Sequence, residues 1–319
     1  MSLSDVASLH NLVTVVDAAS LFEQLGTVDR LVDRGWQAGA EDARTVAQLL
    51  CDQLEFADVL VLNKLDLVSR AQVQTIEALL RRINPSAAIE HTTQSKLEPA
   101  FLLGKARFKL AQVRAQLILV EGVACSPCTA RVVHGSCCAW LVLVVHSSWP
   151  CPSPFTMVRP FRQAEEHPNW LKEAREHEHK PETVEYGISS FVFRATRPFH
   201  PERLHAALAP RGRPGALGRL LRLKGVAWLA TQYHQQMHAA LAGTQFSMSA
   251  GPPWSKTDES GEPRLLDHGD RRTELVCIGQ ELDHVAAAAA LERCLLSKKE
   301  MARGVASWSA LPDPFVHEH

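Results

Sequence analysis

The residues VLVLNKLD at positions 59–66 carry the strongest structural signal in this chain. Their first half is a continuous apolar run, which predicts a strand buried on both faces. Residues 41–56 and 70–83, on either side of it, carry apolar side chains at helical spacing, and further strands are predicted at residues 13–16 and 87–91. Because strands and helices alternate, we expect an α/β domain whose parallel sheet is covered by helices.

Polar side chains follow two of the predicted strands at the point where each strand ends. Asp17 comes directly after residues 13–16, and the tetrad Asn63-Lys64-Leu65-Asp66 follows residues 59–62. In open parallel sheets, ligands bind beyond the carboxyl ends of the strands. We therefore expect a ligand site where these polar residues lie.

The tetrad has the side chains needed to recognise guanine. Guanine presents two neighbouring N–H groups, and the Asp66 carboxylate can accept both in a charge-assisted pair that adenine does not match. Asn63 can bond the purine edge and tie neighbouring loops together, and the stem of Lys64 can lie along the base. The alternative is a polar strand-to-helix turn in which Asn63 and Asp66 only cap the next helix.

Composition favours a two-domain globular protein and gives no sign of nucleic acid or a membrane as a partner. The chain has 319 residues, of which 46% are apolar and 22% charged. A net charge of −1 does not favour nucleic acid or an anionic membrane. No apolar run approaches the roughly 20 residues that span a bilayer. The first residues lack a secretory pattern, so we expect a reducing, cytoplasmic location, with an organelle as the alternative.

The chain divides into three parts, and the middle part differs from the others. Residues 1–110 hold the predicted α/β elements and residues 165–319 the second domain, whereas residues 111–164 are poor in charge. Five cysteines crowd into this middle part: Cys125, Cys128, Cys137, Cys138 and Cys151. A metal site is one interpretation. An insertion or linker without lasting periodicity, or a fault in the gene model, is the interpretation we favour.

The third part predicts a smaller α+β domain. Strands are expected from 184 to 193 and at 226–230, 244–248 and 273–278. Helices are expected at 201–208, at 217–223 with Gly225 as its end, and at 283–296 with Asp283 as its cap. The remaining cysteines are expected to be core residues: Cys51, Cys277 and Cys294.

Both outer parts resemble the CobW-like GTPases, a family that includes zinc-transferring metallochaperones. The matching residues are 14–18, 33–36, 53–58, 63–66, 186–193, 197–201, 224–230, 269–276 and 308–315. The resemblance implies a P-loop GTPase-type sheet followed by a smaller CobW C-terminal domain. It also implies guanine binding by Asn63, Lys64 and Asp66, GTP and Mg²⁺ as cofactors, zinc as cargo and a metal-dependent client protein as partner.

The sequence departs from this family in its phosphate-binding and metal-binding motifs. No segment fits G-x-x-x-x-G-K-[ST], so the phosphate cradle and the Mg²⁺-binding hydroxyl are missing from it. The family's Cys-x-Cys-Cys motif is missing as well. We expect an N-terminally truncated family member with no GTP hydrolysis of its own. The alternative is a non-catalytic binding module, or a remnant that arose from a gene-model error.

Histidines supply two further candidates. His177 and His179 lie where the family often has a histidine-rich loop, and at i, i+2 on an extended segment they would point the same way and could share a metal ion. The alternative is a solvated charged linker. His234 and His238 have the spacing to share one face of a helix, but no acidic residue completes a zinc-protease motif.

Overall fold

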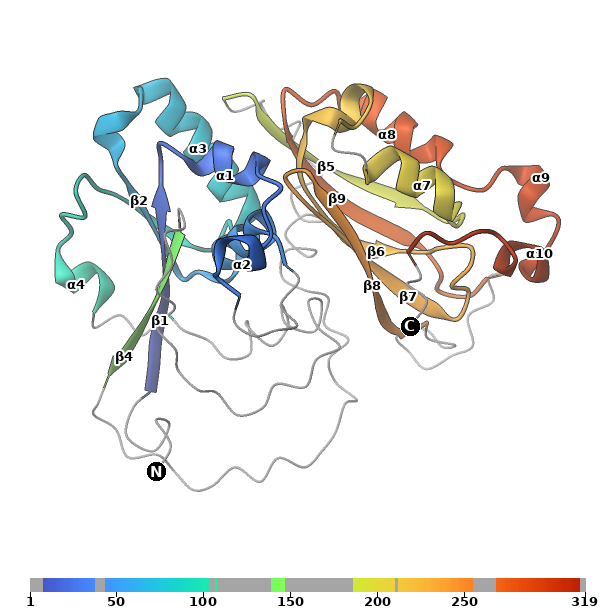
Figure 1. Ribbon diagram of the computed structural model, residues 1–319, viewed down its shortest axis with the longest axis horizontal. Helices are drawn as coiled ribbons and strands as arrows, with labels where there is room; N and C mark the ends of the chain where they lie inside the picture. The colour runs from blue at the N-terminus through green and yellow to red at the C-terminus, as the bar shows by residue number, and fades with distance from the viewer. Residues whose placement is uncertain are drawn as a thin grey trace, which may run out of the picture. The chain divides into compact units, whose positions relative to one another are not determined.

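The computed structural model describes residues 8–37, 44–103, 107, 139–146, 186–209, 212–254 and 268–315 (Figure 1). Its contacts divide the chain into two units, with the boundary between Pro181 and Glu182 and with Leu25–Val28 grouped with the second unit. None of the helices in the described ranges is both long enough and apolar enough to cross a lipid bilayer.

The first unit is built on a four-stranded sheet with the order β3-β2-β1-β4. Its strands are β1 (Ser8–Asp17), β2 (Val59–Asn63), β3 (Ala88–His91) and β4 (Ala139–His146). β1, β2 and β3 run parallel to one another. The expected parallel sheet is confirmed, and each of the three strands predicted for it overlaps an observed one.

Two long helices of the first unit begin at a capping box. The helical elements are α1 (Leu21–Gly26), η2 (Val32–Arg34), α2 (Val46–Phe56), η3 (Leu65–Leu67), α3 (Arg70–Ile83) and α4 (Pro99–Leu102). Thr45 and Gln48 exchange hydrogen bonds at the start of α2, and Ser69 and Gln72 do so at the start of α3. The predicted cap of α3 is confirmed. α2 begins later than residue 41 because Thr45 supplies its cap.

Asn84 fixes the ends of these helices against the sheet. It is buried after α3, and its Nδ2 donates to the carbonyls of Leu54 and Ala57, each at 2.9 Å. Its Oδ1 accepts from the Ala87 amide at 3.0 Å, just before β3 begins. A single buried amide thus satisfies carbonyls at the end of α2 and sets the start of the edge strand.

β4 was not predicted. It lies within residues 111–164, where the sequence indicated an insertion or linker, and it pairs antiparallel with β1 from Ser8 opposite His146 to Val16 opposite Ala139. Its sequence AWLVLVVH is rich in β-branched residues, which favour strands. The clustered cysteines between 125 and 138, and Cys151, lie outside the described residues.

The second unit contains a five-stranded antiparallel sheet with the order β5-β9-β6-β7-β8. The strands are β5 (Ile188–Ala195), β6 (Leu220–Ala227), β7 (Gln235–Ala242), β8 (Gln245–Pro253) and β9 (Thr273–Gln280). The helical elements are α7 (Pro201–Leu208), η5 (Gly215–Arg219), α8 (His284–Arg293), α9 (Lys298–Met301) and α10 (Val305–Ser309). α7 and α8 cover the sheet (Figure 1), which confirms the α+β domain.

The predicted helix at residues 217–223 is wrong. The chain forms the short turn η5 and then enters β6, because the leucines here pack into the core of the sheet rather than along one helical stripe. Gly225 does not end a helix: a Cβ at this position would lie 2.0 Å from the Glu274 carbonyl oxygen of β9. The glycine therefore allows two strands to approach closely.

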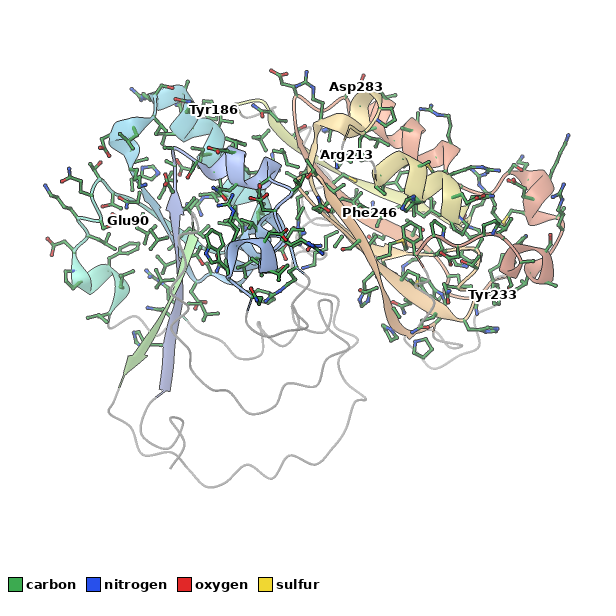
Figure 2. All side chains as sticks on the ribbon, viewed as in Figure 1. Glu90, Tyr186, Arg213, Tyr233, Phe246 and Asp283 are labelled. Carbon is green, nitrogen blue, oxygen red and sulfur yellow. The ribbon has the colours of Figure 1, made fainter. Side chains whose placement is uncertain are left out.

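His234 and His238, whose spacing would allow them to share one face of a helix, do not lie on a helix. His238 lies in β7, which the sequence did not predict, and His234 precedes that strand. Two other predictions hold. Asp283 accepts from the Ala286 amide at 3.0 Å at the start of α8 (Figure 2), and the thiols of Cys51, Cys277 and Cys294 are free and buried.

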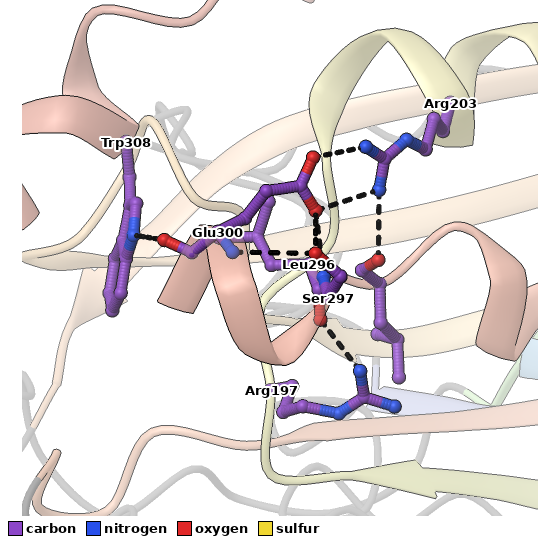
Figure 3. Close-up of polar contacts among 7 residues, drawn as sticks. Arg197, Arg203, Leu296, Ser297, Glu300 and Trp308 are labelled. Atoms are coloured by element: carbon purple, nitrogen blue, oxygen red, sulfur yellow. Dashed lines mark hydrogen bonds and ion pairs between the residues drawn. The ribbon is translucent and has the colours of Figure 1, made fainter. Parts of the chain in front are cut away.

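Several charged side chains of the second unit form hydrogen bonds that join its elements. The Arg203 guanidinium on α7 donates two hydrogen bonds to the Glu300 carboxylate on α9, one of them 3.1 Å long. It also donates to the Leu295 carbonyl at 3.1 Å (Figure 3). Glu300 accepts in addition from the Ser297 amide at 2.7 Å and its hydroxyl at 2.8 Å. Trp308 of α10 donates from its indole to the Glu300 carbonyl at 2.8 Å.

This arrangement keeps Glu300 ionised. The hydrogen bonds from Arg203, followed by those from Ser297, outweigh the effect of burial and lower the pKa of the Glu300 carboxyl to about 2. Arg213 is a second charged side chain that joins elements of this unit. It is buried, and it donates to the carbonyls of Leu217, Leu220 and Gly243 (Figure 2).

Candidate functional site

The polar residues expected to form a site lie where β1 and β2 end side by side. Asp17 and Asn63 are partners in the parallel register, and the Ala18 amide donates to the Asn63 carbonyl at 3.0 Å just beyond it. Both residues therefore stand at the carboxyl edge of the sheet. The structure thus brings Asp17 next to the tetrad, as the sequence predicted.

Lys64 leaves β2 in an unusual backbone conformation and turns back to Asp17. Its φ of 62° and ψ of 36° are left-handed, and its carbonyl accepts from the Leu67 amide at 3.0 Å. Its Nζ lies 2.8 Å from Oδ2 of Asp17, whose Oδ1 accepts from the Ala19 amide at 2.9 Å. The ammonium group of Lys64 is thus fixed at the end of β1.

Asp17 is ionised in this setting. Its partial burial acts to raise the pKa of the carboxyl, but hydrogen bonds from Lys64, the Ala19 amide and the Ser20 hydroxyl lower it below the ordinary value overall. The charge on Lys64 acts in the same direction. A full ion pair between Asp17 and Lys64 is therefore present at neutral pH.

Asn63 ties the tetrad to the loop that follows β3. Its Nδ2 donates to the Ser95 hydroxyl at 3.0 Å, and its Oδ1 accepts from the Ser95 amide at 3.0 Å. The same loop is held by the Thr92 amide, which donates to the Leu62 carbonyl at 2.9 Å, and by the Thr92 hydroxyl, which donates to the Lys96 carbonyl at 2.8 Å. The prediction that Asn63 joins neighbouring loops is confirmed.

Asp66 has no partner among the described residues. It is exposed within η3, and its carboxylate makes no hydrogen bond or ion pair with any residue that the structure describes. α3 is capped instead by Ser69, and both ends of the Asn63 amide are engaged by Ser95. The alternative in which Asn63 and Asp66 merely cap the next helix is therefore wrong.

Backbone strain concentrates at this edge of the sheet. Of the five non-glycine residues with positive φ in the described chain, three lie here: Lys64, Gln94 and Ser95. Left-handed backbone costs an ordinary residue about 1–2 kcal/mol, and such strain tends to cluster at functional sites. Sequence reasoning missed the 92–96 loop. Its run of Thr, Gln and Ser residues after a predicted strand was the available signal.

The structure does not test the predicted metal ligands. His177 and His179 lie outside the described residues. Within the described ranges, no group of three or more His, Cys, Asp or Glu side chains is placed to hold a metal ion.

Two family models match most of the chain outside its middle part. Residues 1–91 match the CobW/HypB/UreG nucleotide-binding domain, and residues 188–295 match the cobalamin synthesis protein cobW C-terminal domain. The candidate site lies in the first match and at its border, since the model ends at His91 and the 92–96 loop follows directly.

Two curated relatives bear names that refer to zinc. The chain is 32% identical to "Zinc-regulated GTPase metalloprotein activator 1" of Dictyostelium discoideum, over 98% of this chain and 57% of that protein. It is 30% identical to a zinc chaperone of Mycobacterium tuberculosis, over 41% of this chain and 35% of that protein. The chain therefore spans about 57% of the length of the first relative and less of the second.

A solved structure shows a weak likeness. The Zn(II)-bound YjiA GTPase of E. coli is 17% identical, with a TM-score of 0.31, over 91% of this chain and 62% of that one. A TM-score this low supports no inference about the site.

Proposed function

The chain belongs to the CobW family, and from this premise we propose that it forms the base-reading and C-terminal parts of a GTP-dependent metal chaperone. The names of its relatives support zinc as the cargo and a metal-dependent protein as the client. One observation carries the proposal: an exposed carboxylate, without a partner in the part of the chain that the structure describes, stands beyond a buried strand on a segment that is anchored on both sides.

Guanine would be held by three residues with different tasks. Asp66 accepts the N1–H and the exocyclic amine of the base, because its carboxylate has no competing donor among the described residues. Lys64 offers its methylene stem to the base while its ammonium stays on Asp17. Asn63 acts by positioning, because Ser95 engages both its amide oxygen and its amide nitrogen.

We assign no residue of this chain to the phosphates or to Mg²⁺. GTP bound with Mg²⁺ supplies the phosphoanhydride whose hydrolysis drives the family's cycle. The sequence holds no G-x-x-x-x-G-K-[ST] segment, so base recognition is the part of that task assigned here. We propose that the chain does not hydrolyse GTP by itself.

Zinc and client contacts are assigned more coarsely. We propose that His177 and His179 hold zinc transiently, since two imidazoles alone make an open, exchangeable site. The second unit would dock the client protein. A zinc titration of the full chain with a His177→Ala, His179→Ala double variant tests the first of these assignments, and unchanged zinc affinity in the variant would overturn it.

Nucleotide titration of the full chain tests the base-reading role. Fluorescent GDP and ADP analogues are titrated into the native chain, Asp66→Asn and Glu23→Gln, an exposed acid on α1 whose loss removes the same charge. We expect a guanine preference in the native chain and in Glu23→Gln. In Asp66→Asn, guanine affinity should fall about 10- to 100-fold, as expected for charge-assisted bonds. Equal binding of both nucleotides to the native chain would refute the role.

A further inference from the structure

We propose that Asp17 is a positioning residue for the base-reading tetrad and that it acts through Lys64. Asp17 has this role in guanine selection only if the tetrad reads guanine, as proposed above. No motif in the sequence contains both residues, since Asp17 ends β1 and Lys64 directly follows β2. Their partnership follows from the parallel register that brings the ends of β1 and β2 together.

The Asp17 carboxylate is itself fixed in place. Its side chain is only 18% exposed, and Oδ1 is held by the Ala19 amide while Oδ2 faces the Lys64 ammonium. The Lys64 side chain is 49% exposed, and without an ion-pair partner it would be free to move. The partly buried and anchored Asp17 carboxylate therefore fixes the position of the flexible Lys64 side chain.

The ion pair favours a strained backbone that Asp66 depends on. Lys64 adopts the left-handed conformation, and its carbonyl receives the Leu67 amide, which closes the η3 turn. Asp66 lies inside that turn. The position of its carboxylate is thus linked to the conformation of Lys64, and the bond to Asp17 stabilises that conformation.

The opposite side of the tetrad has a separate anchor. Asn63 bonds Ser95 twice, and this contact does not involve Asp17. Loss of the Asp17 carboxylate should therefore leave the strand and the 92–96 loop in place. Only the turn that carries Asp66 should loosen, which separates a positioning role from general unfolding.

A double-mutant cycle on the full chain tests this coupling. Fluorescent GDP and ADP analogues are titrated into Asp17→Asn, Lys64→Met and the double variant, with Asp33→Asn, an exposed aspartate paired with Arg30, as the matched control. We expect Asp17→Asn to weaken guanine binding about 10-fold, with less effect on adenine and none in the control. In the Lys64→Met background the same substitution should have no further effect.

The cycle distinguishes action through Lys64 from action through the chain turn. The Ala19 hydrogen bond to Asp17 survives in Lys64→Met, so a role through that turn would reduce guanine affinity equally in both backgrounds. Equal losses in both backgrounds, or no loss in the native background, would overturn the proposal.

A measurement without nucleotide tests the same coupling. Amide hydrogen exchange at Leu67 reports the closure of the η3 turn, because this amide bonds the Lys64 carbonyl. Asp17→Asn should speed this exchange in the native background and leave it unchanged in Lys64→Met, with the Ser95 amide still protected. Unchanged exchange at Leu67 would overturn the role of Asp17. Failure of the native chain to bind guanine would instead refute the proposed function.

Discussion

Asp66 in the first unit and Glu300 in the second are acidic residues in single-turn helices, and their surroundings are opposite. Glu300 receives hydrogen bonds from Arg203 and from Ser297, and its pKa falls to about 2. Asp66 is exposed and has no partner among the described residues. A carboxylate that is fully engaged contributes to stability, whereas one held in place without a partner is available to a ligand.

The surrounding elements show the same contrast. In the second unit, a buried charged side chain stabilises the fold: Arg213 donates hydrogen bonds to three carbonyl acceptors. In the first unit, the polar residues at the strand ends fix strained backbone around an open carboxylate. Similar side chains therefore support the architecture of the second unit and, under the proposed function, serve recognition in the first.

Removing each carboxylate in turn should give the largest difference in the free energy of unfolding. Glu300→Ala should lower the free energy of unfolding of the second unit by about 2–3 kcal/mol, because the charged hydrogen bonds with Arg203 and the Glu300 half of the capping box at α9 are lost. Asp66→Ala should change the free energy of unfolding by less than about 0.5 kcal/mol, as surface substitutions usually do. Urea unfolding of both variants measures the difference. Comparable destabilisation by Asp66→Ala would break the contrast.

Acid should weaken the second unit through the same contact. The folded-state pKa of Glu300, about 2, lies below its ordinary value of 4.5. Its contribution to stability is therefore fully present above about pH 4.5 and is lost as the pH falls toward 2. Urea midpoints between pH 6 and pH 3 should fall more steeply for the native chain than for Glu300→Ala. Parallel pH profiles would show that the Arg203 contact adds no stability.

The cap of α3 gives the smallest expected effect. Ser69→Ala should lower the free energy of unfolding of the first unit by about 1 kcal/mol, because it removes the acceptor for the Gln72 amide. Thr75→Ala, a substitution at a half-buried position within α3, serves as the control and should be close to neutral. Guanine affinity should be the same in both variants. A loss of guanine affinity in Ser69→Ala would mean that the helix start and the tetrad are not independent.

Local signals were sufficient for much of this fold. Continuous apolar runs located β1 and β2, and the caps at Ser69 and Asp283 located the starts of α3 and α8. The tetrad was found from residue type and spacing alone. Each of these features depends on neighbours along the chain, which a sequence displays directly.

Features that depend on distant partners were missed. β4 exists by pairing with β1, more than a hundred residues away, and the leucines of β6 were misread because helix and strand periods are ambiguous in short apolar runs. Ser95 joins the site through Asn63. Asp17 was expected at this edge of the sheet, but its ion pair with Lys64 was not. Tertiary register, which brings these residues together, leaves no mark in local spacing.

Binding of three nucleosides tests the central claim most directly. Guanosine offers Asp66 two N–H groups, inosine offers one and adenosine offers no matching pair, so their affinities for the native chain should fall in that order. Isothermal titration or NMR titration of the full chain with each nucleoside measures this, and Asp66→Asn should abolish the guanosine-to-inosine step. Equal affinity for the three nucleosides, or an unchanged order in Asp66→Asn, would contradict the assignment of Asp66 as the group that reads guanine.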